Sequence, residues 1–228
     1  MRINSNQFRL DYIDRDPPQN ETKPAGPFRQ AQAGEECSLL IFVPRNFKSV
    51  LINAFTGRYG YSHMAVDCGE LDVPTGKRVM IESTVGVGVH YGFQDEYGER
   101  NFVRIPLDGV IQNTLEFCNC IRSKLGEKYD TEEALTFGLL RSPARQICSD
   151  LITVCLPETM LMDITRRHKA NQLQSRSAVR AYGHLNKDLR LFVSPNGFAE
   201  YFGAPRGEYL QGPDQLYQPV LAASGINH

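Results

Sequence analysis

The segment YSHMAVDCGELDVPTGKRVMIEST, residues Tyr61 to Thr84, predicts the centre of the fold. It contains two runs rich in apolar and β-branched residues, Tyr61–Cys68 and Lys77–Thr84. The residues between these runs include glycine, proline and aspartate, which favour a turn. Two such runs joined by a turn are typical of an antiparallel hairpin. We therefore expect two neighbouring strands here.

The register of this hairpin brings complementary side chains together. With a symmetric loop, His63 faces Glu82 and Asp67 faces Arg78, and cross-strand pairs of this kind stabilise a sheet. The other face is apolar, with Met64 opposite Ile81 and Val66 opposite Val79. Because side chains alternate between faces, a slip of one residue would separate His63 from Glu82. A carboxylate beside an imidazole fixes the tautomer and stabilises the imidazolium. We predict that His63 is a general base and that Glu82 orients it.

The segment Arg145–Pro157, RQICSDLITVCLP, supplies the predicted nucleophile. Apolar residues recur at helical spacing around Cys148, so a helix is expected to begin near this residue. The unpaired N–H groups and the dipole at the start of a helix favour a thiolate over a thiol. A buried structural cysteine is the alternative interpretation. The histidine and carboxylate predicted upstream favour the catalytic interpretation.

The composition limits the classes of protein to which this chain can belong. The 228 residues carry a net charge of −1, so no strong electrostatic field points to nucleic acid. The sequence has no apolar run long enough to span a membrane and no signal-peptide pattern, so we expect a soluble, cytoplasmic protein without a transmembrane segment. Its six cysteines match neither a disulfide scaffold nor a zinc-binding pattern. We therefore expect reduced thiols, no metal and no organic cofactor.

The chain divides into three parts by composition. Residues 1–36 form a polar arm with four prolines, residues 37–210 form the catalytic domain, and residues 211–228 form a tail. Within the domain, strands are expected at Ser38–Pro44, in the segment ending with Phe102–Ile105, and at Leu189–Val193. Helices are expected at Phe47–Phe55, Asp108–Leu125 and Leu161–His168, a turn and a second short helix within Leu125–Leu140, and a turn at Pro195–Gly197.

Several motifs together carry a family resemblance. They are LLIFVP, INAFTGRYGYSHMAVDCGE, VMIEST, GEKYDTEEALTF, ICSDLIT and VSPNGFAEYF. In this order they resemble the permuted papain-like hydrolases of the NlpC superfamily, in which the histidine precedes the cysteine. The resemblance implies an α+β fold, circularly permuted, with a central antiparallel sheet packed against helices. It also implies Cys148 as nucleophile, His63 as base and Glu82 as orienting acid, and it matches Tyr129 and Asp130 to a Tyr-Asp pair.

Four further residues are candidates for binding substrate or supporting the triad: Tyr129, Tyr61, Ser149 and His90. For His90, in the glycine-rich VGVGVHYG, a loop histidine without a role in binding is the alternative interpretation. No histidine has the spacing of a metal ligand.

The predicted activity is cleavage of a peptide or isopeptide amide through a thioester on Cys148. A lipid thioesterase or acyltransferase of the same fold, or a binding module without turnover, is the alternative. The expected partner is a peptide-like or acyl substrate, including a lipid-linked one.

Overall fold

A computed structural model describes residues 27–30, 37–43, 60–97, 102–129, 147–170, 179–182, 190–205 and 215–216. Its strands are β1 (Phe28–Gln30), β2 (Ser38–Phe42), β3 (His63–Asp67), β4 (Glu70–Asp72), β5 (Val79–Thr84), β6 (Gly88–Phe93), β7 (Phe102–Pro106), β8 (Val179–Tyr182), β9 (Arg190–Val193) and β10 (Gln215–Leu216). Its helices are the 3-10 helix η1 (Gln94–Tyr97) and the α-helices α2 (Thr114–Ser123), α4 (Cys148–Thr153), α5 (Glu158–Lys169) and α6 (Pro195–Tyr201). The helix expected at Phe47–Phe55 and most of Leu125–Leu140 lie outside the described residues.

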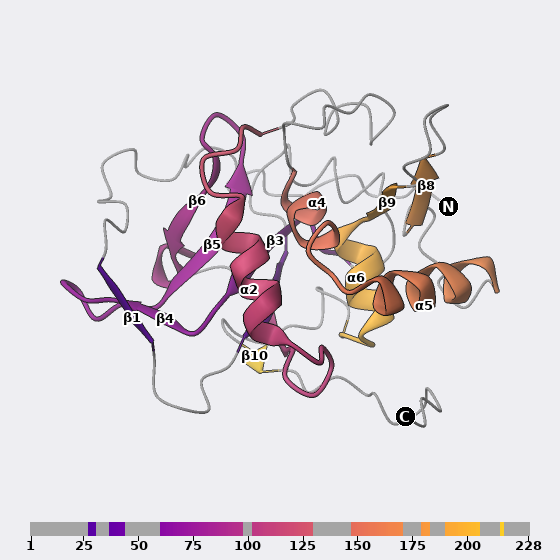
Figure 1. Ribbon diagram of the computed structural model, residues 1–228, viewed down its shortest axis with the longest axis horizontal. Helices are drawn as coiled ribbons and strands as arrows, with labels where there is room; N and C mark the ends of the chain where they lie inside the picture. Colours follow the sequence, from indigo (N-terminus) through magenta and orange to yellow (C-terminus); the bar gives the residue numbers. More distant parts are fainter. Residues whose placement is uncertain are drawn as a thin grey trace, which may run out of the picture.

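The main sheet has the strand order β10-β7-β2-β3-β5-β6. All neighbours from β7 to β6 are antiparallel, and β10 adds to the edge in parallel. Two smaller sheets pair β1 with β4 and β8 with β9. The fold is thus mixed, with helices and a central antiparallel sheet, as the sequence predicts at this level (Figure 1).

One face of the main sheet packs against helices. Apolar residues of β2, β3, β5 and β7 on this face form one core with α2, α4, α5 and α6, in which Leu151 and Ile152 of α4 are fully buried. Figure 1 shows α2 crossing in front of the sheet, with α4, α6 and α5 beside it. The opposite face carries a smaller apolar cluster, formed by Leu40, Phe42, Ala65, Met80 and Phe102. Both faces of the central strands are therefore covered, which explains why β2 is buried along its whole length.

The predicted hairpin is present, but its register was wrong by two residues. β3 and β5 are antiparallel neighbours, and Ala65, not His63, lies opposite Glu82. The loop is not symmetric, because it contains the short strand β4, which pairs with β1. A shift of two residues leaves every side chain on its predicted face. His63 and Glu82 therefore remain on the same face of the sheet.

Two further expectations about local structure were wrong. The helix expected from Asp108 begins only at Thr114, because the Asn113 side chain caps it by accepting a hydrogen bond from the Glu116 N–H. The turn expected at Pro195–Gly197 is the first turn of α6. Its cap is Ser194, whose hydroxyl accepts from the Gly197 N–H, and proline is well suited to the first helical position.

The arm and the tail both contribute strands. Phe28 of β1 also packs its ring against Tyr91, with ring centroids 4.3 Å apart. At the other end, Gln215 and Leu216 pair with β7. Short segments of the predicted arm and tail thus add strands to the sheets. No helix of the described residues is both long and apolar enough to cross a bilayer.

The expectation of six reduced thiols was also wrong. Disulfides join Cys68 to Cys118 and Cys120 to Cys155, and Cys37 and Cys148 are the free cysteines. The paired cysteines are 50 and 35 residues apart, on elements that only the folded chain brings together.

Candidate active site

Cys148 is the first residue of α4, as predicted, and its side chain is buried. The helix packs against β3, β5 and β9, which fixes the position of its first turn relative to the sheet. The residue before it, Ile147, has no side chain that can cap the helix. The backbone N–H groups of the first turn therefore lack the side-chain acceptor that usually occupies this position.

His63 lies between Cys148 and Glu82. Its Nε2 is 2.6 Å from Glu82 Oε2, within the hydrogen-bond distance expected from the sequence. Cys148 acts on the same ring, because it raises the pKa of His63. Since Nε2 faces the carboxylate, the nitrogen left for the sulfur is Nδ1. The imidazole is thus placed between the start of α4 and the Glu82 carboxylate of β5.

Glu82 is buried and has further polar neighbours. The Tyr97 hydroxyl donates to its carboxylate, at 2.7 Å from Oε1 and 2.6 Å from Oε2. His90, directly opposite on β6, places Nε2 3.6 Å from Oε1. Gly92 leaves room for the carboxylate, since a Cβ there would lie 2.8 Å from Oε1. These contacts hold Glu82 in one orientation toward His63.

Aromatic rings enclose the imidazole. The Tyr97 ring is stacked on that of His63, with centroids 6.3 Å apart, and Phe42 lies 5.6 Å away on the adjacent strand β2. Tyr97 therefore contacts both His63 and Glu82. No local sequence pattern predicted this role, because Tyr97 is in a short 3-10 helix beyond β6.

The charges of the site depend on one another. Burial alone lowers the pKa of His63, but hydrogen bonds to Cys148 and Glu82 and the charges of both outweigh it and raise the pKa from 6.5 to about 9. Burial alone raises the pKa of Glu82, whereas the His63 hydrogen bond and charge, the His90 charge and the Tyr97 hydroxyl together lower it. A protonated imidazole between a carboxylate and a sulfur is the result. Such an imidazolium stabilises a neighbouring thiolate.

No family model, curated protein or solved structure matches the chain. The chemistry of the site rests on its geometry. A sulfur, an imidazole and a buried carboxylate arranged in this order can act as nucleophile, base and orienting group in covalent acyl transfer.

The other predicted site residues occupy different environments. Tyr61 is fully buried, and its hydroxyl donates to the Pro205 carbonyl at 2.6 Å, so it supports β3 from within the core. Ser149 is buried next to Cys148. Tyr129 is partly buried beyond α2, and its partner Asp130 lies outside the described residues. Roles in substrate binding stay predictions for Ser149, Tyr129 and His90.

The backbone before His63 is held by a residue that the sequence did not single out. The Asn196 side chain accepts from the Tyr61 N–H at 2.9 Å and donates to the Tyr61 carbonyl at 3.0 Å. Asn196 is fully buried on α6. The Asn196 amide thus makes two hydrogen bonds of the kind that a neighbouring strand would make with the Tyr61 backbone, just before β3 begins.

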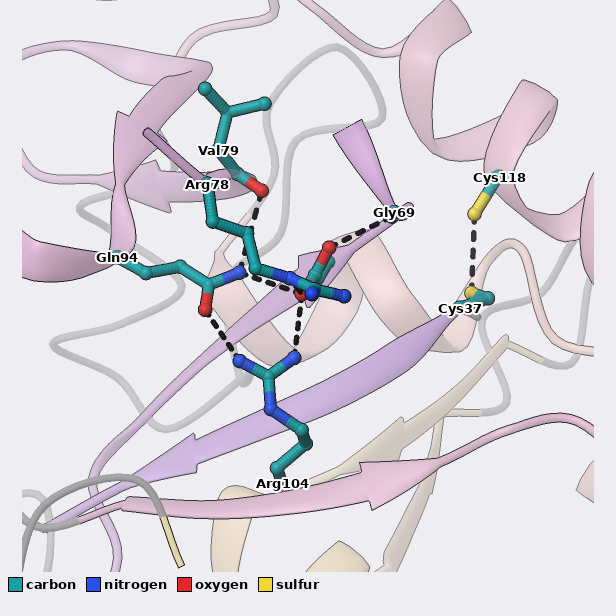
Figure 2. Close-up of polar contacts among 8 residues, drawn as sticks. Cys37, Gly69, Arg78, Val79, Gln94, Arg104 and Cys118 are labelled. Carbon is teal, nitrogen blue, oxygen red and sulfur yellow. Dashed lines mark hydrogen bonds and ion pairs between the residues drawn. The ribbon is translucent and has the colours of Figure 1, made fainter. Parts of the chain in front are cut away.

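A second polar cluster surrounds Asp67 at the far end of β3. Arg78, Arg104, Gln94 and the Gly69 N–H all donate to its carboxylate. Figure 2 shows how the side chains of Arg78, Gln94 and Arg104 come together here. The predicted contact of Asp67 with Arg78 is therefore present despite the changed register. Because Asp67 is fully buried and has several donors, it is a structural ion-pair centre. Among the described residues, the one group suited to a metal ion is Cys37, Cys68 and Cys118, also at this end of β3.

Proposed function

We propose that this protein is a cysteine hydrolase that cleaves an amide bond of a peptide-like substrate. The observation that carries the proposal is the hydrogen bond of His63 to the buried Glu82, with Cys148 at the start of α4 acting on the same imidazole. A buried structural cysteine would need neither an imidazole beside its sulfur nor a carboxylate behind that imidazole.

We further propose that the fold is a permuted papain-like fold. Two features support this: the strand that carries His63 precedes the helix that carries Cys148 in the chain, and that helix packs on an antiparallel sheet. The mixed architecture, with helices and a central antiparallel sheet, is compatible with the NlpC superfamily that the sequence motifs resemble.

The mechanism follows from the three groups. His63 holds the proton of the Cys148 thiol as an imidazolium, and the thiolate attacks the acyl carbon. The protonated imidazole then gives its proton to the leaving amine, which leaves a thioester on Cys148. His63 next removes a proton from water, and the hydroxide releases the acid and restores the thiol. Glu82 stabilises the imidazolium in both steps.

The developing oxyanion needs donors close to the sulfur. The backbone N–H of Cys148 is our candidate for one of them, because it begins α4 and no side chain caps that turn. Loss of one such donor typically lowers the rate by 10²- to 10³-fold.

Selective alkylation tests the nucleophile. Under non-reducing conditions the free thiols are Cys37 and Cys148, and both are buried. Burial and the neighbouring charges of Asp108 and Asp67 raise the pKa of Cys37, whereas Cys148 contacts a protonated imidazole. Limiting iodoacetamide at neutral pH, followed by peptide mass spectrometry, should therefore label Cys148 first.

Turnover of acyl amide and ester surrogates should be lost in Cys148→Ala and kept in Cys37→Ser, the matched control. Preferential labelling of Cys37, or turnover by Cys148→Ala, would overturn the proposal. Comparison of amide with ester turnover separates an amidase from a thioesterase or acyltransferase.

A further inference from the structure

Three cysteine sulfurs meet in the core, away from His63. The Sγ atoms of Cys37, Cys68 and Cys118 all lie within 4.8 Å of one another, and each residue is buried. Cys68 and Cys118 form a disulfide, and the Cys37 sulfur lies 3.1 Å from that of Cys118. Figure 2 shows the sulfurs of Cys37 and Cys118 facing each other.

The fold itself creates this group. Cys37 precedes β2 and Cys68 follows β3, and the register Ser38↔Asp67 makes these cysteines the next pair across the two strands. Their side chains lie on the sheet face that packs against α2, and α2 carries Cys118. The Cys37 carbonyl also accepts from the Leu107 N–H at 2.8 Å, which holds the strand end in place. Three separate elements therefore bring the sulfurs together.

A structural disulfide accounts for two sulfurs and leaves the third unexplained. Thiolates bind Zn²⁺ at about 2.3 Å, so two sulfurs on one ion lie no more than about 4.6 Å apart. The three sulfurs all lie within 4.8 Å of one another, so they are close enough to reach one ion once the disulfide is opened. Asp108 follows Leu107, whose N–H donates to the Cys37 carbonyl, and its buried Oδ2 has no hydrogen-bond partner. A carboxylate in this part of the chain is compatible with a bound cation.

We propose that, once the Cys68–Cys118 disulfide is reduced, Cys37, Cys68 and Cys118 bind a Zn²⁺ ion. A dithiol or phosphine reductant supplies the two electrons that convert the disulfide into two thiols. Binding then releases three protons, one from each thiol, and forms three Zn–S bonds. The ion replaces the disulfide as the link between β2, β3 and α2. This site is independent of the proposed catalytic function.

The proposal is tested on the full-length protein. The protein is reduced with a phosphine, freed of reductant without oxygen, and titrated with Co²⁺ as an optical probe, which Zn²⁺ then displaces. We expect one equivalent of Co²⁺ with a thiolate-to-cobalt charge-transfer band. Cys37→Ser should weaken binding by on the order of tenfold or more, since even a residue that only supports a ligand typically contributes that much. The double variant Cys120→Ser/Cys155→Ser, which leaves the three cysteines intact, should bind like the wild type.

X-ray absorption of the Zn²⁺-loaded wild type gives a second measurement that needs no variant. Three sulfur neighbours at about 2.3 Å are expected. The proposal is overturned if the reduced protein binds no ion, if Cys37→Ser binds as tightly as the wild type, or if oxygen and nitrogen make up the first shell.

Discussion

Glu82 has a buried carboxylate that contacts His63 and Tyr97, with His90 nearby. Glutamine at this position keeps the shape and a hydrogen-bond acceptor but cannot stabilise an imidazolium. We expect Glu82→Gln to keep the fold and KM and to lower kcat by on the order of 10²-fold. Steady-state kinetics on folded, purified variants measure this effect.

Tyr97→Phe is the matched control for Glu82→Gln. It removes the hydroxyl that donates to the carboxylate and keeps the ring stacked on His63, so a smaller loss of kcat is expected. If Glu82→Gln turned over like the wild type, another group would orient His63.

The raised pKa of His63 predicts how the stability of the protein depends on pH. This pKa is raised from 6.5 to about 9 in the folded protein. The imidazolium therefore contributes stability that is complete below pH 6.5 and is lost as the pH rises through 9. Glu82→Gln removes one cause of the shift, so its melting temperature should fall less over this interval than that of the wild type. Parallel curves of Tm against pH for the two proteins would contradict the coupling.

Among the elements, the central strands illustrate what the sequence could predict. Alternation of apolar and polar residues located β3 and β5 and assigned their faces, because that pattern has a period of two. The same period cannot distinguish two registers that differ by two residues. The register depends on β4, which lies in the loop between the two strands and pairs with β1. β1 is about 40 residues away in the chain, and no local sequence pattern indicates that it pairs with β4. The His63–Glu82 contact was predictable because it depends on the face.

Disulfides and caps were harder to predict. Pairing of Cys120 with Cys155 depends on how α2 packs beside α4, which no spacing in the sequence encodes. Pro195 and Gly197 are compatible with either a turn or the start of a helix. The hydrogen bond of the Ser194 side chain to the Gly197 N–H stabilises the helix. The Tyr97 and Asn196 contacts likewise appear only when distant segments meet.

Helix α2 is joined by disulfides to residues that follow β3 and α4, the two elements that carry the proposed base and nucleophile. Through Cys118 it is joined to the end of β3, and through Cys120 to Cys155, just beyond α4. The Cys120–Cys155 bond closes a loop of 35 residues, for which loop entropy gives a stabilisation of about 3 to 4 kcal/mol. Cys120→Ser/Cys155→Ser should lower the free energy of unfolding by about this amount.

Because Leu151 and Ile152 still anchor α4 in the core, kcat of that double variant should be unchanged well below its melting temperature. Denaturant titration of the oxidised proteins gives the difference, and with a reductant present the two proteins should converge. Equal stability of the oxidised proteins would show that the bond contributes nothing.

At the scale of the whole molecule, the position of His63 depends on a residue from the opposite end of the domain. Asn196 is 135 residues from Tyr61 in the chain, and its amide bonds both the N–H and the carbonyl of that residue. Helix α6 thus holds the start of β3, which carries the proposed base. A truncation or substitution in α6 should therefore change the geometry of the candidate active site, although α6 contributes none of its three proposed catalytic residues.

Asn196→Ala removes both bonds to the Tyr61 backbone. Because buried backbone groups that lose a partner typically cost 1 to 3 kcal/mol, unfolding should become easier by about that amount. The start of β3 should also shift, so kcat is expected to fall and the NMR titration of His63 to move from about 9 toward 6.5. Tyr61→Phe is the control, because it removes only the hydroxyl bond to Pro205 and leaves the backbone contacts in place. A rise in KM in Tyr61→Phe would place that hydroxyl in substrate binding. An Asn196→Ala protein that lost stability but kept the kcat and His63 titration of the wild type would limit Asn196 to a role in folding.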